Sequence, residues 1–138
     1  MPTLPSNTSF LTTMKALTVT GVDRYYDEPP ASIDISAGEA AFLTMPDSSR
    51  GEQISTCINQ SKTRSIGFVI IVDAAGQGTQ AQNYGKLAAL MDSLETSLDA
   101  LAPGTVNFIE YEIGTTGNYS LGGSDYWAII ATITARDI

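Results

Sequence analysis

The sequence predicts an α+β protein in which a mostly antiparallel sheet of four to six strands packs against one long and one short helix. Three observations support this class. Apolar residues recur every three or four positions between Gln80 and Leu101, a continuous apolar run lies within residues 64–73, and segments of strand character flank both. At 138 residues the chain is expected to form a single domain over residues 1–138.

The first elements are an arm and a short helix. Residues 1–7 contain two prolines and are expected to form a flexible arm. A helix should begin at an N-cap on Thr8 or Ser9 and end at Gly21. Its apolar positions recur at helical spacing, and they are Phe10, Leu11, Met14 and Leu17.

Strand formers follow this helix. Tyr25 and Tyr26 precede two consecutive prolines, which cannot continue a ladder of hydrogen bonds, so this strand is expected at a sheet edge. After a polar connection, residues 40–45 should form a second strand. The segment from Pro46 to Gly51 is rich in turn residues and predicts a mobile loop.

The middle of the chain predicts two further strands. Residues 54–59 alternate apolar with polar side chains, which is typical of a half-buried strand. A turn is expected over residues 60–63. Residues 64–73 are apolar on both alternating faces, with Phe68, Ile70 and Val72 on one face and Val69 and Ile71 on the other. This pattern favours a central strand that is covered on both sides.

The long helix is predicted from Gln80 to Leu101, after a loop of small residues at 74–78 and before Pro103. Its expected packed face consists of Tyr84, Leu87, Ala88, Met91, Leu94, Leu98 and Leu101. Its expected solvent face consists of Lys86, Asp92, Glu95 and Asp99.

Two strands should complete the sheet. In the first, Ile109, Tyr111 and Ile113 are expected to face inward, while Glu110 and Glu112 face solvent. A flexible loop with four glycines is expected from residue 114 to 125. The last strand is predicted over residues 126–137, and its inward positions are Trp127, Ile129, Ala131, Ile133 and Ala135.

Composition disfavours several functions. The net charge is −8, and the seven basic residues are scattered singly along the sequence, so no cationic face for gripping DNA is expected. Cys57 is the single cysteine, which excludes an internal disulfide. The first residues lack the pattern of a secretory signal, and no apolar run approaches the roughly 20 residues of a membrane span. We therefore expect a soluble protein made in a cytoplasm.

An enzyme is not expected, and we predict no catalytic, metal or cofactor residues. Histidine is absent, which removes the commonest general base and a common metal ligand. Cys57 is expected to be a buried strand residue. Asp73, Glu110 and Glu112 could form a carboxylate group, but the two glutamates are more simply read as the solvent face of a strand.

One motif suggests an alternative function, nucleotide binding. Gly76-Gln77-Gly78-Thr79-Gln80-Ala81 has the spacing G-x-G-x-x-A between a strand and a helix, where backbone N–H groups can bind a phosphate. The fingerprint requires an acidic residue about 20 positions further on at the end of a second parallel strand, whereas here that position lies in the helix near Asp99. A small nucleotide-binding domain is therefore the weaker hypothesis.

Partner contact is expected at exposed aromatic and arginine side chains and in the two predicted loops, because these residue types bury much area at interfaces. The interface candidates are Arg24, Tyr25, Tyr26, Arg50, Tyr119, Leu121 and Tyr126.

The segment GVDRYYDEPP at residues 21–30 follows the pattern G-V-x-R-x-Y-x-x-x-P, and the expected order of elements extends on both sides of it. In these features the chain resembles the tail terminator family of long-tailed bacteriophages. The resemblance implies a structural virion protein of the tail and neck, present in the host cytoplasm during assembly, that closes into a homohexameric ring. It also implies binding to the major tail tube protein and to a head–tail connector protein.

In such a ring DNA would pass through the lumen without specific binding, which the acidic balance permits. The mechanism would be binding without chemistry: the ring ends growth of the tail tube and joins the tail to the head. Another neck or head–tail connector component is the alternative, because related folds serve several of these positions.

Overall fold

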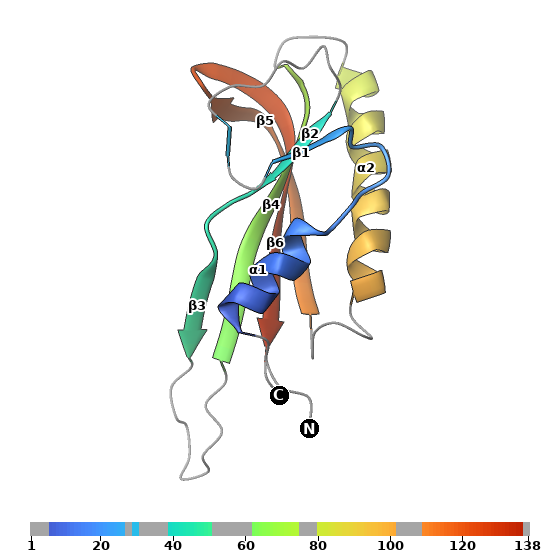
Figure 1. The fold of residues 1–138 in the computed structure, drawn as a ribbon. Coiled ribbons are helices and arrows are strands. Elements are labelled where there is room, and N and C mark those ends of the chain that lie inside the picture. Colours follow the sequence, from blue (N-terminus) through green and yellow to red (C-terminus); the bar gives the residue numbers. More distant parts are fainter. Residues whose placement is uncertain are drawn as a thin grey trace.

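The computed structural model describes residues 6–26, 29–30, 39–50, 62–74, 80–101 and 109–136. These residues form two helices and six strands (Figure 1). The elements in chain order are α1 (Asn7–Lys15), β1 (Arg24–Tyr26), β2 (Ala40–Leu43), β3 (Asp47–Arg50), β4 (Lys62–Ala74), α2 (Gln80–Leu101), β5 (Ile109–Leu121) and β6 (Ser124–Arg136). The predicted α+β class is confirmed.

A single sheet has the strand order β1-β2-β4-β6-β5, and β3 pairs with the start of β4 beyond the end of β2. All pairs are antiparallel except β1 with β2. β4 is central, since it pairs with β2 and β3 on one side and with β6 on the other. The prediction of a central strand at residues 64–73 is therefore confirmed.

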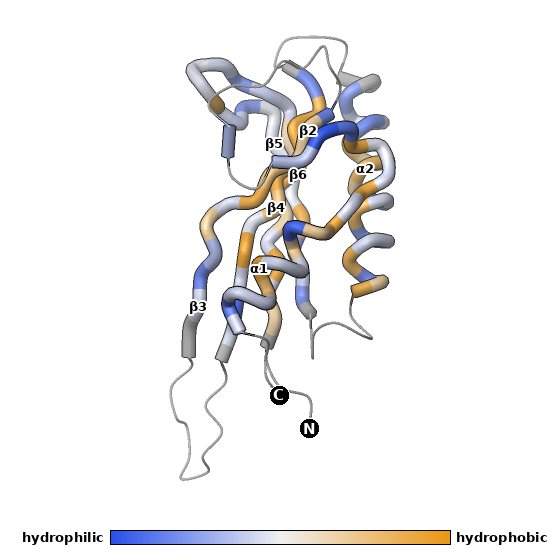
Figure 2. The backbone as a smooth tube through the Cα atoms, viewed as in Figure 1, coloured by the Kyte–Doolittle hydropathy of each residue, from blue (hydrophilic) through white to orange (hydrophobic). Residues whose placement is uncertain are grey.

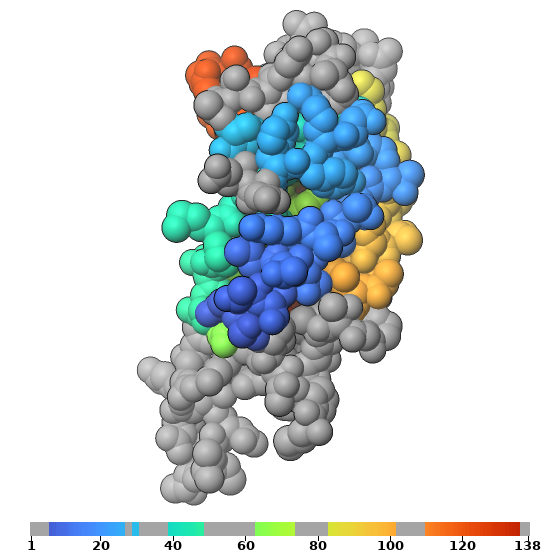
Figure 3. All heavy atoms as spheres, viewed as in Figure 1, coloured from blue at the N-terminus to red at the C-terminus, as the bar shows by residue number. Residues whose placement is uncertain are grey.

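The larger core lies between the sheet and both helices, which cover the same face (Figure 1). Phe10 and Met14 of α1 and Leu94 and Leu98 of α2 are buried there against the sheet. The sheet contributes alternate residues of its central strands, namely Ile66, Phe68, Ile70, Val72, Ile129, Ala131, Ile133 and Ala135. Helix α1 and the segment that leads from it to β1 form a continuous surface across the front of the molecule (Figure 3).

A smaller apolar cluster lies on the other face of the sheet, where the described residues include no helix. Its buried members are Ala40, Phe42, Val69, Ile71, Tyr126 and Ala128. The end of the β5–β6 hairpin bends over toward this cluster (Figure 1). Alternate residues of β4 belong to the two clusters, so both faces of this strand are apolar, and hydrophobic residues colour part of its tube in Figure 2. The register of β5 against β6 shifts between Thr116 and Tyr119, which is where such a bend is expected.

The short helix differs from its prediction at both ends. Ser6 is the N-cap, and its Oγ accepts a hydrogen bond from the N–H of Ser9 at 3.1 Å, so neither Thr8 nor Ser9 caps the helix. The helix ends at Lys15 with Ala16 as its C-cap. Gly21 instead takes a positive φ of 98° in the following turn, which explains why a glycine stands there.

The segment predicted as a mobile loop at Pro46 to Gly51 contains a strand. β3 pairs with β4, and Asp47 lies opposite Ser65. The prediction failed because backbone hydrogen bonds, which polar residues make as well as apolar ones, hold this strand. The expected second strand ends earlier, at Leu43, and the expected turn at 60–63 gives way to β4 from Lys62 onward. The strand predicted at residues 54–59 lies outside the described residues.

The loop predicted from residue 114 to 125 is a tight hairpin. β5 continues to Leu121 and β6 begins at Ser124, so only Gly122 and Gly123 turn the chain. Both have positive φ, 60° and 83°, as a two-residue hairpin turn requires. Gly114 lies within β5, where strand pairing restricts the freedom that the sequence suggested.

The bounds predicted for the long helix are confirmed, but the prediction of its packed face was wrong in part. Tyr84 and Ala88 are exposed, whereas Asn83 and Leu90 are buried. The polar Asn83 hid the true start of the buried stripe, which continues through Leu87, Leu90, Leu94 and Leu98. The predicted solvent face is confirmed, since Lys86, Asp92, Glu95 and Asp99 are all exposed.

Candidate functional site

The interface candidates on β1 lie at an edge of the sheet, as predicted. Tyr25 is 41% exposed, yet its hydroxyl accepts a hydrogen bond from the N–H of Val19 at 2.7 Å and donates one to the carbonyl of Val19 at 2.9 Å. Nη1 of Arg24 donates a hydrogen bond of 3.4 Å to the hydroxyl of Tyr26. Tyr25 therefore fixes the segment before β1 as well as exposing part of its ring.

Three other candidates belong to the small apolar cluster. Tyr119 packs on Phe42 with ring centroids 6.0 Å apart, and Leu121 is half-buried beside it. Burial raises the pKa of Tyr119 above its ordinary value. Tyr126 is only 6% exposed, so its ring is not an accessible contact surface in the isolated chain. Tyr26 is also half-buried against this cluster.

Arg50, the remaining candidate, ends β3 directly opposite Lys62. Two residues further along β4, Nη1 of Arg64 donates a hydrogen bond of 2.7 Å to Oγ of Ser48. Arg136 lies one ladder step away, opposite Thr63. The strand register therefore places the backbones of four of the seven basic residues at one end of the sheet, which their spacing along the sequence does not show.

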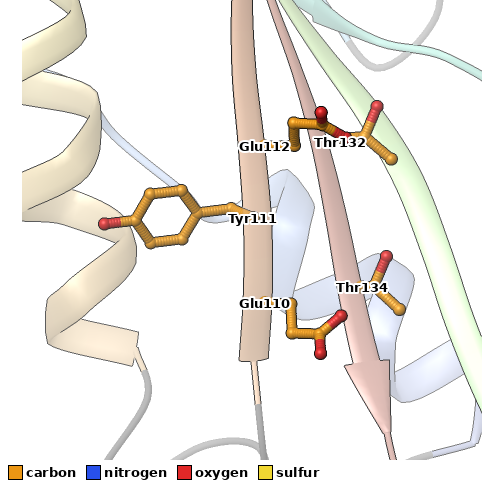
Figure 4. A pocket seen from close by; sticks show the side chains of 5 residues that line it. All are labelled: Glu110, Tyr111, Glu112, Thr132 and Thr134. Atoms are coloured by element: carbon orange, nitrogen blue, oxygen red, sulfur yellow. The ribbon is translucent and has the colours of Figure 1, made fainter.

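A shallow groove lies on the helix-free face of the β5–β6 ladder. It is lined by Glu110, Tyr111, Glu112, Thr132 and Thr134. Glu110 lies opposite Thr134 and Glu112 opposite Thr132, and all four side chains point to one side of the sheet (Figure 4). The ring of Tyr111 points the other way, toward α2. The solvent exposure predicted for the two glutamates is confirmed.

Further carboxylates lie beside β5 on the face of the sheet that the helices cover. The hydroxyl of Tyr111 donates a hydrogen bond of 2.8 Å to Oδ1 of Asp99. The pKa of Tyr111 is raised above 10.0. The largest cause is this hydrogen bond to Asp99, and desolvation and the negative charges of Asp99 and Glu95 contribute less. Asp92 lies on the same exposed face of α2. The edge of the sheet at β5 is therefore acidic on both sides.

A second group lies near the start of α2. Tyr84 is 56% exposed and meets Trp127 edge to face, with ring centroids 6.0 Å apart. Gly117 of β5 lies under the same indole, because a Cβ there would be 3.1 Å from it. Nζ of Lys86 lies 3.8 Å from Oδ2 of Asp73. These contacts could not be predicted from the sequence, since they join residues far apart in the chain.

The described residues contain no cluster that could hold a metal ion. Asp73 lies opposite Trp127 and Glu112 opposite Thr132, so Asp73 is at a different level of the sheet from the two glutamates of β5 and does not join them. Cys57 and the motif residues Gly76–Thr79 lie outside the described residues. Within the described part of the chain, no helix is long and apolar enough to cross a membrane.

Neither the protein-family models nor the curated proteins searched contain a match to this chain.

Proposed function

We propose that this chain is a structural subunit of a bacteriophage virion, a tail terminator that forms a ring at the head-proximal end of the tail tube. The support is the resemblance of the GVDRYYDEPP segment together with an α+β fold of the kind that the resemblance implies. The ring ends tube growth through contacts with the major tail tube protein and joins the tail to a head–tail connector protein.

The observation that carries the proposal is the open edges of the sheet. β5 runs for thirteen residues and pairs with β6 alone among the described strands. Within the part of the chain that the structure describes, β1 pairs only with β2, and β3 only with β4. A strand edge that the described strands leave unpaired is a surface to which another chain can add. Open edges on both sides of a sheet suit a subunit that assembles with others.

The proposed contacts are placed at these edges. Arg24 and Tyr25 lie on β1, Arg50 lies on β3, and the carboxylates of β5 lie at the opposite edge. None of these contacts requires chemistry. DNA would pass the acidic protein without specific binding, since like charges limit adhesion.

The test is reconstitution with tail tubes. The major tail tube protein is polymerised with and without this chain, and tube lengths are measured by electron microscopy. We expect defined ends that carry an added ring and no further growth. Tubes that grow to the same lengths in both samples, with bare ends, would refute the proposal. A protein that binds only the isolated head–tail connector would support the alternative neck role instead.

A further inference from the structure

Two aromatic side chains, Tyr84 and Trp127, form an aromatic pair on the surface near the start of α2. Tyr84 is 56% exposed, and its ring meets Trp127 of β6 edge to face. Trp127 is half-buried and rests on Gly117 of β5, so its position is fixed while part of the residue stays accessible. Tyrosine and tryptophan are the residue types that most often anchor a protein partner.

Each ring of the aromatic pair also carries a hydrogen-bond donor, the hydroxyl of Tyr84 and the indole N–H of Trp127. Neither donor makes a hydrogen bond within the part of the chain that the structure describes. Lys86 is matched by Asp73, the ladder partner of Trp127, at 3.8 Å. The surface therefore offers aromatic faces and two donors beside charges that are already paired, which suits an uncharged ligand with carbonyl acceptors.

A proline-rich segment is a ligand of this kind. The sequence P-x-x-P favours the polyproline II helix, which has no internal hydrogen bonds and docks on surfaces lined by aromatic side chains. Residues 2–5 of this chain read Pro-Thr-Leu-Pro, and no charged side chain occurs before Lys15. The adjacent prolines Pro29 and Pro30 lack this spacing and follow two acidic residues, Asp27 and Glu28. Residues 2–5 are therefore the better match.

This segment cannot reach the aromatic pair of its own copy. The carbonyl of Thr18 accepts a hydrogen bond of 2.7 Å from Oγ of Ser97, in the second half of α2. Helix α1, which precedes Thr18 in the chain, begins still further from the start of α2 (Figure 1). The helix between Tyr84 and Ser97 is about 20 Å long, whereas an extended chain from Ser6 back to Pro2 spans at most about 14 Å.

We infer that residues 2–5 of one copy bind the aromatic pair of a second copy. The two prolines pack on the rings, and backbone carbonyls of the segment accept hydrogen bonds from the hydroxyl of Tyr84 and the indole N–H of Trp127. Because the contact joins two different surfaces, successive copies can close into a ring. The inference adds a contact between subunits to the proposed function, and rests on it for the expectation that copies assemble.

The first test is a peptide titration. The peptide Met-Pro-Thr-Leu-Pro-Ser, residues 1–6, is added to the variant Pro2→Ser/Pro5→Ser, which removes competition from the chain's own segment. Trp127 is the single tryptophan and the peptide has no aromatic residue, so tryptophan emission reports on this ring alone. We expect a saturable change. The same peptide with serine at both proline positions, and the peptide of residues 27–32, should bind at least about tenfold more weakly.

Substitutions of Tyr84 locate the binding site of the peptide. Tyr84→Ala should weaken binding at least about tenfold, because one ring of the aromatic pair is lost. Tyr84→Phe should weaken binding less, because the ring remains and only the hydroxyl is removed. Met45→Ala is the matched control, since Met45 is 83% exposed but lies between β2 and β3. Each of these substitutions is made in the variant Pro2→Ser/Pro5→Ser, and melting temperatures establish that the proteins fold.

The second test measures association of copies by light scattering and native mass spectrometry. Pro2→Ser/Pro5→Ser and Tyr84→Ala, the latter with both prolines present, should each associate at least about tenfold more weakly than the wild type. A mixture of the two should form pairs, since one variant keeps the aromatic pair and the other keeps the proline segment.

Unchanged emission, equal binding of the serine peptide, or equal binding of the peptide after Tyr84→Ala would each overturn the inference. Association of the folded Pro2→Ser/Pro5→Ser variant at the wild-type level would also overturn it, and would assign the aromatic pair to a proline segment of another protein.

The proposed function is judged separately, by the capping of tail tubes with the wild-type protein. Capping without peptide binding would remove this contact and leave the proposed function standing. Peptide binding and association without capping would leave the contact and remove the proposed function.

Discussion

Tyr111 of β5 is joined to Asp99 of α2 by a hydrogen bond of 2.8 Å between the phenolic hydroxyl and Oδ1. This contact connects the last turns of the helix to an edge strand. We expect Tyr111→Phe to lower the free energy of unfolding by about 0.5–1 kcal/mol, the range for one solvent-accessible hydrogen bond. Urea unfolding measures the loss, and Asp99→Asn together with the double variant completes a cycle that isolates the pair.

The contribution of this pair depends on pH with a definite sign. The pKa of Tyr111 is raised in the folded chain, so folding favours the protonated phenol. The stability difference between the wild type and Tyr111→Phe should therefore be fully present below pH 10. It should disappear as the pH rises through the raised pKa of Tyr111. A difference that grows above pH 10 would contradict this assignment.

The main core should depend on the contact between α2 and β4. Leu94 and Ile70 both have 0% exposure and belong to the same cluster. Leu94→Ala and Ile70→Ala should each lower stability by about 2–5 kcal/mol, through lost burial and the cavity left behind. Met45→Ala is the matched control, since Met45 is 83% exposed and its loss should change the melting temperature little. Equal melting temperatures for all three variants would mean that the packed faces are misassigned.

The elements with strong periodicity could be predicted from the sequence, because burial itself creates the pattern. Strand β4 is covered on both faces and α2 on one, so their apolar residues mark both elements. β3 could not be predicted in this way, since Ser48 and Ser49 are held by backbone pairing with β4 and leave no apolar signature. In the β5–β6 hairpin, Gly114 and Gly117 were read as flexible although both lie within a strand.

The candidate surfaces were harder to predict for a related reason. Arg50 and Lys62 are neighbours only because of the β3–β4 register, and Tyr111 meets Asp99 only because α2 packs beside β5. Sequence spacing carries no information about such non-local pairs. The burial of Tyr126 could not be predicted, because the small cluster that buries it joins residues of the bent hairpin to β2 and β4.

Gly67 should tolerate no side chain. Its N–H donates to Oγ1 of Thr44 at 3.0 Å, and a Cβ at this position would overlap that same oxygen. Gly67→Ala should therefore lower stability by about 1–3 kcal/mol, because the threonine must move and lose its hydrogen bond. Gly114→Ala is the control, since it also lies in a strand and nothing stands within 4 Å of its added Cβ. Thermal unfolding compares them, and equal melting temperatures would contradict the proposed overlap.

The motif at Gly76 to Ala81 is expected to bind no nucleotide. It lacks the acidic residue at the end of a second parallel strand, and the described strand that follows α2, β5, pairs antiparallel with β6. Titration calorimetry with common dinucleotides and nucleoside triphosphates should show only heats of dilution. Micromolar binding that Gly78→Val abolishes would establish the nucleotide-binding alternative.

The end of the β5–β6 hairpin should be a structural part of the fold. Tyr119 packs on Phe42, which is 1% exposed, so removing the ring uncovers a core residue of β2. Tyr119→Ala should lower stability by about 2–4 kcal/mol, somewhat less than the loss of a fully buried aromatic side chain, because Tyr119 is only partly buried. Asn118→Ala is the control, because it changes the neighbouring exposed residue and removes only a local hydrogen bond with Thr116. Denaturant unfolding decides the matter: if Tyr119→Ala is as stable as Asn118→Ala, the hairpin end is a dispensable extension and the small cluster does not depend on it.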